Sequence, residues 1–107
     1  MKEKNKIDEF DITITKVSMA KNVKIAVIGV GGGGGNMINV LAKSAIRDHI
    51  KLVSANTDAQ ALEDCTADTK ILLGPNTTKG QGAGMDPELG KRAALESYEE
   101  IKEALKH

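Results

Sequence analysis

Aromatic side chains are almost absent from this chain of 107 residues. The sequence has no tryptophan, and its only aromatic residues are Phe10 and Tyr98. A buried core must therefore consist of valine, isoleucine, leucine and alanine, a composition that suits parallel strands covered by helices. Apolar residues make up 40% of the chain and charged residues 28%, which is ordinary for a globular protein. We predict an α/β fold of one domain, near the lower size limit for a well-buried core.

Cysteine and histidine are also scarce. Cys65 is the only cysteine, which excludes an internal disulfide and a cysteine-based metal site. The sequence shows no base beside it, which favours a buried bystander thiol over a nucleophile. His49 and His107 have no second ligand at helical spacing, so neither one indicates a metal site. No catalytic residue is predicted, and no metal ligand can be assigned from these side chains.

An excess of one charge and a long apolar run are both lacking. The fifteen basic and fifteen acidic residues cancel, so no overall field attracts nucleic acid or an anionic membrane surface. No stretch approaches the roughly 20 apolar residues that span a bilayer, and no signal-type apolar run follows the charged segment 1–11. We expect a cytoplasmic protein without nucleic acid as a partner and without direct insertion into a membrane.

Glycine, by contrast, is abundant and much of it forms one run. Residues 23–28 are nearly continuous in apolar β-formers, which is typical of a strand buried on both faces. The strand is expected to stop at Gly29, and the unbroken glycines 31–35 are expected to form a loop. An amphipathic helical stripe follows at Ile38, Leu41, Ala42 and Ala45. The predicted order is strand, glycine loop, helix.

Two further strands are predicted downstream. Residues 51–55 and 71–73 have strand composition, with a turn at 56–58 and a short helix at 59–64 between them. These connections suit a parallel sheet. The alternating residues near the start, within 1–22, suit either an edge strand or a flexible arm, and we favour the arm because no sheet is evident for it to join.

One long helix is expected from Pro87 to the end of the chain. Asp86 can cap its free amides, Pro87 suits its first position, and Glu88 complements its dipole. The buried stripe is expected at Ala94, Tyr98, Ile101 and Leu105. The charged residues beside this stripe, Glu96 among them, are expected to form a solvated face. Residues 74–86 are expected to be a flexible loop, too rich in glycine to hold a helix.

The glycine run between a strand and a helix favours anion binding. Residues without a Cβ let the backbone approach a phosphate, and the amides and dipole of the helix favour negative charge. A merely flexible turn is a poorer explanation, because five consecutive glycines cost conformational entropy on ordering. Gly29, Gly31 and Gly34 also have the spacing of NAD-type dinucleotide-binding modules, with Asp58 near the place of a ribose-binding acid. No P-loop lysine follows Gly35, so the loop alone does not decide the ligand.

Three segments together resemble the FtsZ family of tubulin-like GTPases. They are Val-Ile-Gly-Val-Gly-Gly-Gly-Gly-Gly-Asn at 27–36, Asn-Thr-Asp-Ala-Gln-Ala-Leu at 56–62 and Gly-Ala-Gly-Met-Asp-Pro-Glu-Leu-Gly at 82–90. Their order and spacing are those of the family's first three nucleotide loops. The resemblance implies that residues 23–107 form the first, incomplete part of a Rossmann-like parallel-sheet GTPase domain. Residues 1–22 would be a variable extension.

The resemblance implies a GTP site. The residues that match the three loops are Gly32, Gly33, Gly34, Gly35, Asn36, Asn56, Asp58, Gly82, Ala83 and Gly84. In the family the first loop holds the phosphates, the second lies at the phosphate end near Mg²⁺, and the third senses the γ-phosphate. Asp58 has a second expected role as N-cap of the following short helix. The third loop leads into the helix at Pro87, whose N-terminus makes a second anion cradle.

The family also implies activities that residues 1–107 do not cover. Its Gly-Gly-Gly-Thr-Gly-Thr-Gly loop, its base-binding residues and its hydrolytic Asn-x-Asp-x-x-Asp loop are expected beyond His107. The parent would associate head to tail into filaments of the division ring at mid-cell, contact other division proteins and hydrolyse GTP between subunits. This chain alone is expected to be inactive. The alternatives are an NAD-type module and a truncated, non-enzymatic regulator of division.

Overall fold

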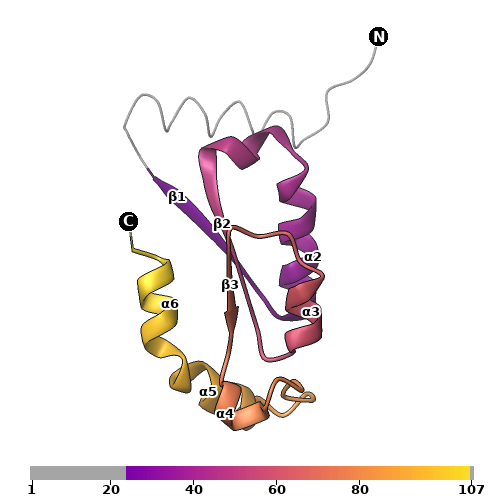
Figure 1. Ribbon diagram of the computed structural model, residues 1–107, viewed down its shortest axis with the longest axis vertical. Coiled ribbons are helices and arrows are strands. Elements are labelled where there is room, and N and C mark those ends of the chain that lie inside the picture. The colour runs from indigo at the N-terminus through magenta and orange to yellow at the C-terminus, as the bar shows by residue number, and fades with distance from the viewer. Residues whose placement is uncertain (1–23, 107) are drawn as a thin grey trace.

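The computed structural model describes residues 24–106, which form an α/β fold around three strands (Figure 1). The elements are β1 (Ile25–Val30), α2 (Gly31–Ala42), the 3-10 helix η1 (Ala45–His49), β2 (Ile50–Asn56), α3 (Ala59–Glu63), β3 (Thr69–Leu72), α4 (Pro75–Thr78), α5 (Pro87–Glu96) and α6 (Tyr98–Ala104). The predicted fold class and the three predicted strands are confirmed. The choice between arm and edge strand within 1–22 lies outside the described residues, as does His107.

The sheet is parallel, in the order β1-β2-β3. Ile25 is in register with Ile50, and Val53 is in register with Thr69. Because all three strands run the same way, their carboxyl ends meet at one edge of the sheet, where the chain leaves β1 at Val30. The loops that carry the three predicted motifs therefore start from or return to this edge.

Each face of the sheet has its own core, because side chains alternate along β2 between the two faces. Leu52 packs with Ile38 of α2, whereas Val53 packs with Ala93 of α5 and Ala104 of α6. Figure 1 shows α2 on one side of the strands and α6 on the other. The core under α2 contains Ile38, Ile46, Ile50, Leu52 and Cys65. The core under α5 and α6 contains Val53, Ala55, Ile71, Leu73, Ala93 and Ala104. These small aliphatic cores match the expectation drawn from the scarcity of aromatic residues.

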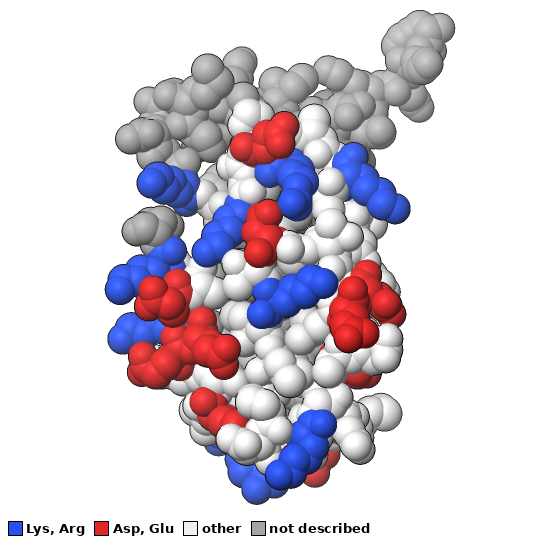
Figure 2. Space-filling model, viewed as in Figure 1, with Lys and Arg blue, Asp and Glu red and all other residues white. Residues whose placement is uncertain are grey.

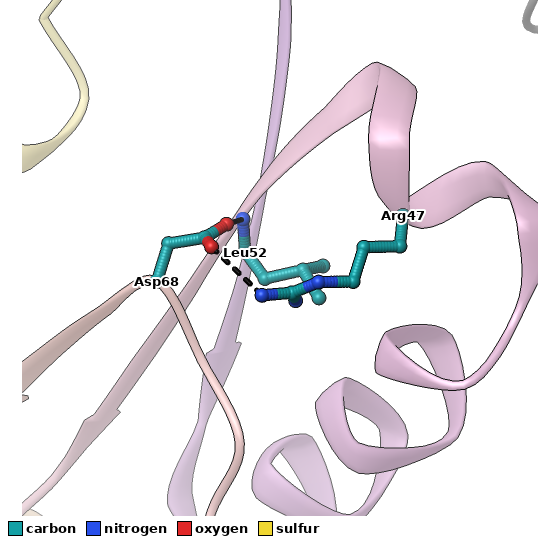
Figure 3. Close-up of polar contacts among 3 residues, drawn as sticks. All are labelled: Arg47, Leu52 and Asp68. Atoms are coloured by element: carbon teal, nitrogen blue, oxygen red, sulfur yellow. Dashed lines mark hydrogen bonds and ion pairs between the residues drawn. The ribbon is translucent and has the colours of Figure 1, made fainter.

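Asp68, the residue just before β3, connects β3 to β2 at the amino-terminal end of the sheet (Figure 3). Its Oδ2 accepts the amide of Leu52 at 2.8 Å, and its own amide donates to the Leu52 carbonyl at 2.9 Å. Its Oδ1 accepts Nη2 of Arg47 at 3.0 Å, which ties η1 to the same point. Both side chains are about a third or more exposed, so we assign the ion pair no more than about 1 kcal/mol. The carboxylate therefore completes the hydrogen bonding between β2 and β3 at the amino-terminal end of β3.

The expected glycine loop is wrong, because α2 begins at Gly31 and includes the rest of the glycine run. Within the run 31–35 only Gly31 has a positive φ, 77°, so the turn from strand to helix takes a single residue. A Cβ on Gly34 would lie 2.6 Å from the carbonyl carbon of Gly29. The helix backbone thus packs directly on β1, and this tertiary contact overrides the low helix propensity of glycine.

The expected flexible loop at 74–86 contains the short helix α4 and is wrong in that part. Gly74 has φ of 57°, which turns the chain after β3, and Pro75 takes the first helical position. Proline is tolerated there because the first amide of a helix has no intrahelical partner. The rest of the segment, Gly74 and residues 79–86, contains no helix or strand, although Gln81 pairs with Asp58 in an isolated antiparallel bridge.

The expected single C-terminal helix is also wrong, because it divides at Ser97 into α5 and α6. Ser97 is 2% exposed, and its Oγ accepts the amide of Gly74 at 2.9 Å and donates to the carbonyl of Leu72 at 3.4 Å. A buried hydroxyl needs such partners. The N-cap at Asp86 and Pro87 at the first position are confirmed, with Asp86 Oδ1 accepting two amides at 3.1 and 3.3 Å.

The break at Ser97 changes which residues are buried. Because α6 begins as a new helix after Ser97, its buried face is not continuous with that of α5, and the expected single buried stripe is wrong. Tyr98 is 56% exposed and Leu105 41% exposed, whereas Ala93 and Ala104 are buried. Of the expected stripe, only Ala94 and Ile101 are partly buried.

Candidate functional site

The carboxyl edge of the sheet carries two adjoining clefts. The first, of about 260 Å³, lies between the start of α2, the end of β2 and α3. The second, of about 310 Å³, lies between the end of β1 and the segment that follows α4. Gly31 and Asn56 line both clefts and so mark their common boundary. Such an edge is where open α/β sheets bind ligands.

The first cleft gathers residues from the first two predicted loops. Its lining consists of Gly31, Gly32, Gly35, Asn36, Asn39, Ser54, Asn56, Ala61, Asp64 and Cys65. Four of the predicted site residues are in this set: Gly32, Gly35, Asn36 and Asn56. None of the lining residues is basic, so an anion in this cleft would be held by backbone amides and side-chain amides.

The acidic and basic side chains are interspersed on the face of the molecule that Figure 2 shows, without a patch of one sign.

The start of α2 presents unoccupied backbone amides. Val30 is its N-cap and makes no side-chain capping bond, and the first turn contains no acidic residue. The first four amides of a helix have no intrahelical partner. A Cβ added to Gly32 or to Gly33 would meet nothing within 4 Å. The first turn is therefore open to a ligand on the side of these two glycines, with the positive end of the helix dipole behind it.

Gly34 and Gly35 differ from the glycines before them. The Cα of Gly34 faces Gly29 of β1, so the missing side chain at this position serves the contact between helix and strand. A Cβ on Gly35 would lie 3.9 Å from Sγ of Cys65, an ordinary contact at the floor of the cleft. Cys65 is 5% exposed and its thiol faces the Gly35 carbonyl at 3.7 Å, which agrees with the expected buried thiol.

The second predicted loop is ordered by side-chain hydrogen bonds. Oδ1 of Asn56 accepts the amide of Asp58 at 3.0 Å, which fixes the turn after β2. Oδ1 of Asp58 in turn accepts the amides of Gln60 and Ala61 at 3.0 and 3.3 Å. The expected role of Asp58 as N-cap of the short helix is thus confirmed. Among residues 24–106 the side-chain amide nitrogen of Asn56 has no hydrogen-bond acceptor, so it can donate toward the clefts that this residue lines.

The third predicted loop lies against the second. The amide of Gly82 donates to the carbonyl of Thr57 at 3.1 Å, and the amide of Ala59 donates to the carbonyl of Gly80 at 3.0 Å. Gly82 and Gly84 have φ of 87° and 55°, values that require glycine or strain. Ala83 lines the second cleft, and Gly84 is exposed. Loops that are more than twenty residues apart in the sequence are therefore joined by backbone hydrogen bonds.

Some side chains at the site carry little signal in the sequence. Asn39, Ser54 and Asp64 also line the first cleft. Asn39 follows Asn36 by one helical turn, a spacing that could have indicated a shared polar face of α2. Oδ1 of Asn39 accepts the amide of Thr66 at 2.7 Å, which joins α2 to the segment after α3. Ser54 gives no signal, because a serine within a strand is equally compatible with a buried structural role.

The described residues supply no ready metal centre. Within 24–106 no group of three histidine, cysteine or acidic side chains is placed to hold a metal ion. His49 is exposed at the opposite edge of the sheet, at the end of η1. In the same range no helix has the length and apolar character to span a bilayer.

Comparison with known proteins gives one consistent family. The Tubulin/FtsZ family, GTPase domain, matches residues 24–107. A cell division protein FtsZ from Pseudomonas aeruginosa is 51% identical over 88 residues, which are 82% of this chain and 22% of that protein. An FtsZ dimer from M. jannaschii has a TM-score of 0.76 at 44% identity, over 90% of this chain and 28% of the other. CetZ2 from Haloferax volcanii, in a GTPgS-bound protofilament, has a TM-score of 0.67 at 27% identity, over 78% of this chain and 26% of the other. The chain thus spans about a fifth of the length of the FtsZ relative.

Proposed function

The chain belongs to the Tubulin/FtsZ family, and from that membership we propose that it forms the phosphate-binding first part of a GTP site. The observation that carries the proposal is the open, uncapped glycine turn at the start of α2, which lies beside Asn56 at the carboxyl edge of the sheet. Backbone amides at a helix N-terminus suit a phosphate and need no lysine or arginine. The absence of basic residues from the lining of the first cleft is consistent with this mode of binding.

Each loop has a proposed part in holding the nucleotide. The free first-turn amides, those of Gly32 and Gly33, bind phosphate oxygens. Gly34 and Gly35 seat this turn against β1 and the floor of the first cleft, and the side chain of Asn36 donates toward the same cleft. Asn56 donates its free amide nitrogen at the boundary of the two clefts. The third loop, with Gly82, Ala83 and Gly84, contacts the terminal phosphate. Its left-handed glycines turn the backbone there without a Cβ in the way.

The described residues offer fewer groups for Mg²⁺ than for the phosphates. Mg²⁺ retains several water molecules and is bound mainly by phosphate oxygens with one or two carboxylates. Oδ1 of Asp58 caps α3, so only its second oxygen is available toward a hydrated ion. Asp64 is the one carboxylate in the lining of the first cleft, and Asp58 lines neither cleft. We propose that this chain contributes at most a water-mediated contact to a metal that the nucleotide carries.

The wider function is proposed from the relatives. We propose a cell division protein that binds GTP, associates with further copies of itself into filaments and acts in the cytoplasm at the division site. Contacts with other division proteins belong to the same proposal. The NAD-type alternative rests on glycine spacing alone, and family membership accounts for that spacing. A non-enzymatic regulator of division would differ only in the sequence beyond residue 107, and reading the downstream DNA decides between the two.

The proposal is tested by nucleotide titration of the purified chain. We expect a fluorescent GTP analogue to bind in the presence of Mg²⁺, and NAD⁺ not to displace it. Gly32→Val should weaken binding about tenfold or more, because its side chain enters the open space beside the first turn and obstructs the amides. Val40→Leu, at an exposed position near the other end of the same helix, is the matched control. Equal affinities of both variants for the GTP analogue, or displacement by NAD⁺, would refute the proposed site.

A further inference from the structure

The start of α4 lacks a cap of its own. Its N-cap residue is Gly74, which has no side chain, and Pro75 at the first position has no amide hydrogen. The amide of Asn76 therefore needs an acceptor from elsewhere, and the amide of Thr77 has only the Gly74 carbonyl, at 3.0 Å, which also accepts the amide of Thr78. A four-residue helix has little stability without such a partner.

Glu96, the last residue of α5, supplies that acceptor. Its Oε2 accepts the amide of Asn76 at 3.0 Å. Its Oε1 accepts both the amide of Thr77 at 3.0 Å and the hydroxyl of Thr77 at 2.7 Å. These bonds lower the pKa of Glu96 below its ordinary value of 4.5, with the Thr77 hydroxyl as the largest cause. The carboxylate is thus held by three donors on an exposed surface, where a solvated charge was expected.

Ser97, the residue after Glu96, also binds the start of α4, from the buried side. The hydroxyl of buried Ser97 accepts the amide of Gly74 at 2.9 Å. Gly74 also packs against Ala93, and an added Cβ would meet the Ala93 backbone. The end of α5 therefore holds the whole entry to α4, with Ser97 inside and Glu96 outside.

The far end of α4 leads directly into the third loop. The carbonyl of Thr78, its last residue, accepts the amide of Gln81 at 3.0 Å. The hydroxyl of Thr78 donates to the carbonyl of Thr57 at 3.3 Å, and the same carbonyl accepts the amide of Gly82 at 3.1 Å. A shift of α4 would therefore move Gln81 and Gly82 away from the second loop.

We propose that Glu96 is a positioning residue that caps α4 in place of the missing local cap and so holds loop 79–84 beside Thr57, ready for the terminal phosphate. The part that concerns the phosphate rests on the proposed function. The bonds from Glu96 to α4 and from α4 to the loop do not. If Glu96 were only a solvated charge, its replacement would have the same effect as replacement of any exposed glutamate on this surface.

Four single variants of the chain test the proposal. Glu96→Gln places an NH₂ group against one of the three donors, and Thr77→Val removes only the hydroxyl. Thr77→Ser keeps the hydroxyl and is the conservative rescue of Thr77→Val. Glu100→Gln is the matched charge control, because Glu100 is an exposed glutamate of α6 that makes no hydrogen bond or ion pair with another side chain among residues 24–106. Circular dichroism verifies that each variant keeps its fold.

The first measurement is amide hydrogen exchange, read by NMR without nucleotide. We expect the amides of Gln81 and Gly82 to exchange about tenfold faster in both test variants, because Glu96→Gln weakens the capping acceptor and Thr77→Val removes the hydroxyl that holds this acceptor in place. Thr77→Ser and Glu100→Gln should stay within about twofold of the original chain. Unchanged exchange at both amides in both test variants would overturn the proposal. Faster exchange confined to Asn76 and Thr77 would also overturn it, because the cap would then be local.

The second measurement is the ratio of affinities for a non-hydrolysable GTP analogue and for GDP. We expect this ratio to fall in Glu96→Gln and Thr77→Val while the affinity for GDP changes little, because only the loop next to the terminal phosphate is displaced. Faster exchange with an unchanged ratio would overturn the role toward the phosphate. If the original chain binds neither nucleotide, the proposed GTP site fails, and the exchange data still decide whether Glu96 positions the loop.

Discussion

At the scale of single residues, two glycines determine how closely α2 lies on β1. Gly29 and Gly34 face each other across the junction, and a Cβ on either one would overlap the backbone of the other. The open glycines of the same run, Gly32 and Gly33, have no such neighbour. Adjacent glycines in one helix turn therefore have different functions: Gly34 is needed for packing, and the open pair leave room for a ligand.

This division predicts opposite effects of the same substitution. Gly34→Ala should lower the free energy of unfolding by about 1–3 kcal/mol, because the added methyl group forces α2 away from β1. Gly33→Ala should leave that free energy unchanged or raise it by up to about 1 kcal/mol, because alanine favours the helix and its methyl group meets open space. Urea unfolding followed by circular dichroism measures both. A stable Gly34→Ala variant would show that the close contact is not required.

At the scale of elements, the sequence predicts those strands and helix caps that are determined by residues close together in the chain. The strands follow from runs of apolar β-formers. The caps at Asp58 and Asp86 follow from an aspartate directly before each helix, whose side chain accepts the amides two and three residues later. The division of the last helix does not follow, because it depends on the bond from Gly74 to Ser97, 23 residues later. The helix at α4 likewise depends on Glu96, 20 residues after Asn76. Such pairings have no periodic signal.

The candidate site divides in the same way. The three loops are recognisable because each contains its own glycine or asparagine pattern, and the parallel strands bring their starts to one edge. The helical form of the glycine run is not recognisable, because glycine has low helix propensity and the stabilising contact is with β1. The lining by Ser54 and Asp64 depends on how β2 and α3 face α2, which only the folded chain determines.

The contact between α4 and α5 should depend on pH. The pKa of Glu96 is lowered by hydrogen bonds from Thr77 and Asn76, and no charged group contributes to the shift. The stabilisation by the carboxylate is therefore complete above about 4.5, the ordinary value, and is lost as pH falls through the lower pKa of the folded state. The amide chemical shift of Thr77 in NMR should follow this titration, with a midpoint below 4.5 that added salt changes little.

The control for this titration is Glu96→Gln, in which the amide of Thr77 should show no transition between pH 3 and 5, roughly the range in which a glutamate titrates. A midpoint at or above the ordinary value would mean that the three hydrogen bonds are not formed in solution. A midpoint that moves strongly with salt would assign the shift to a neighbouring charge in place of the Thr77 hydroxyl.

At the scale of the whole molecule, the proposed site has groups that suit a phosphate, and its lining within residues 24–106 has few groups that could transfer one. The first cleft is lined by backbone, amides, a serine, a thiol and one carboxylate, and no lysine or arginine lines it. Phosphoryl transfer needs positive groups or metal ions against the charge that develops on the leaving phosphate, together with a group that orients the attacking water. In the proposed site, the amides and dipole of α2 would stabilise a bound nucleotide and its transition state to similar extents, which would raise affinity more than rate.

We therefore expect residues 1–107 to bind GTP without hydrolysing it. Phosphate release from GTP with Mg²⁺, measured on the purified chain after its fold has been verified, should not exceed the release in buffer alone. Higher concentrations of the chain should not change this result, because the hydrolytic Asn-x-Asp-x-x-Asp loop, which the resemblance to the family places in the neighbouring subunit, does not occur within residues 1–107. Gly32→Val, in which nucleotide binding is expected to be weakened, identifies contaminating activity, because a contaminant's turnover would persist in that variant. Turnover that scales with the chain and disappears in Gly32→Val would place the catalytic groups within this sequence.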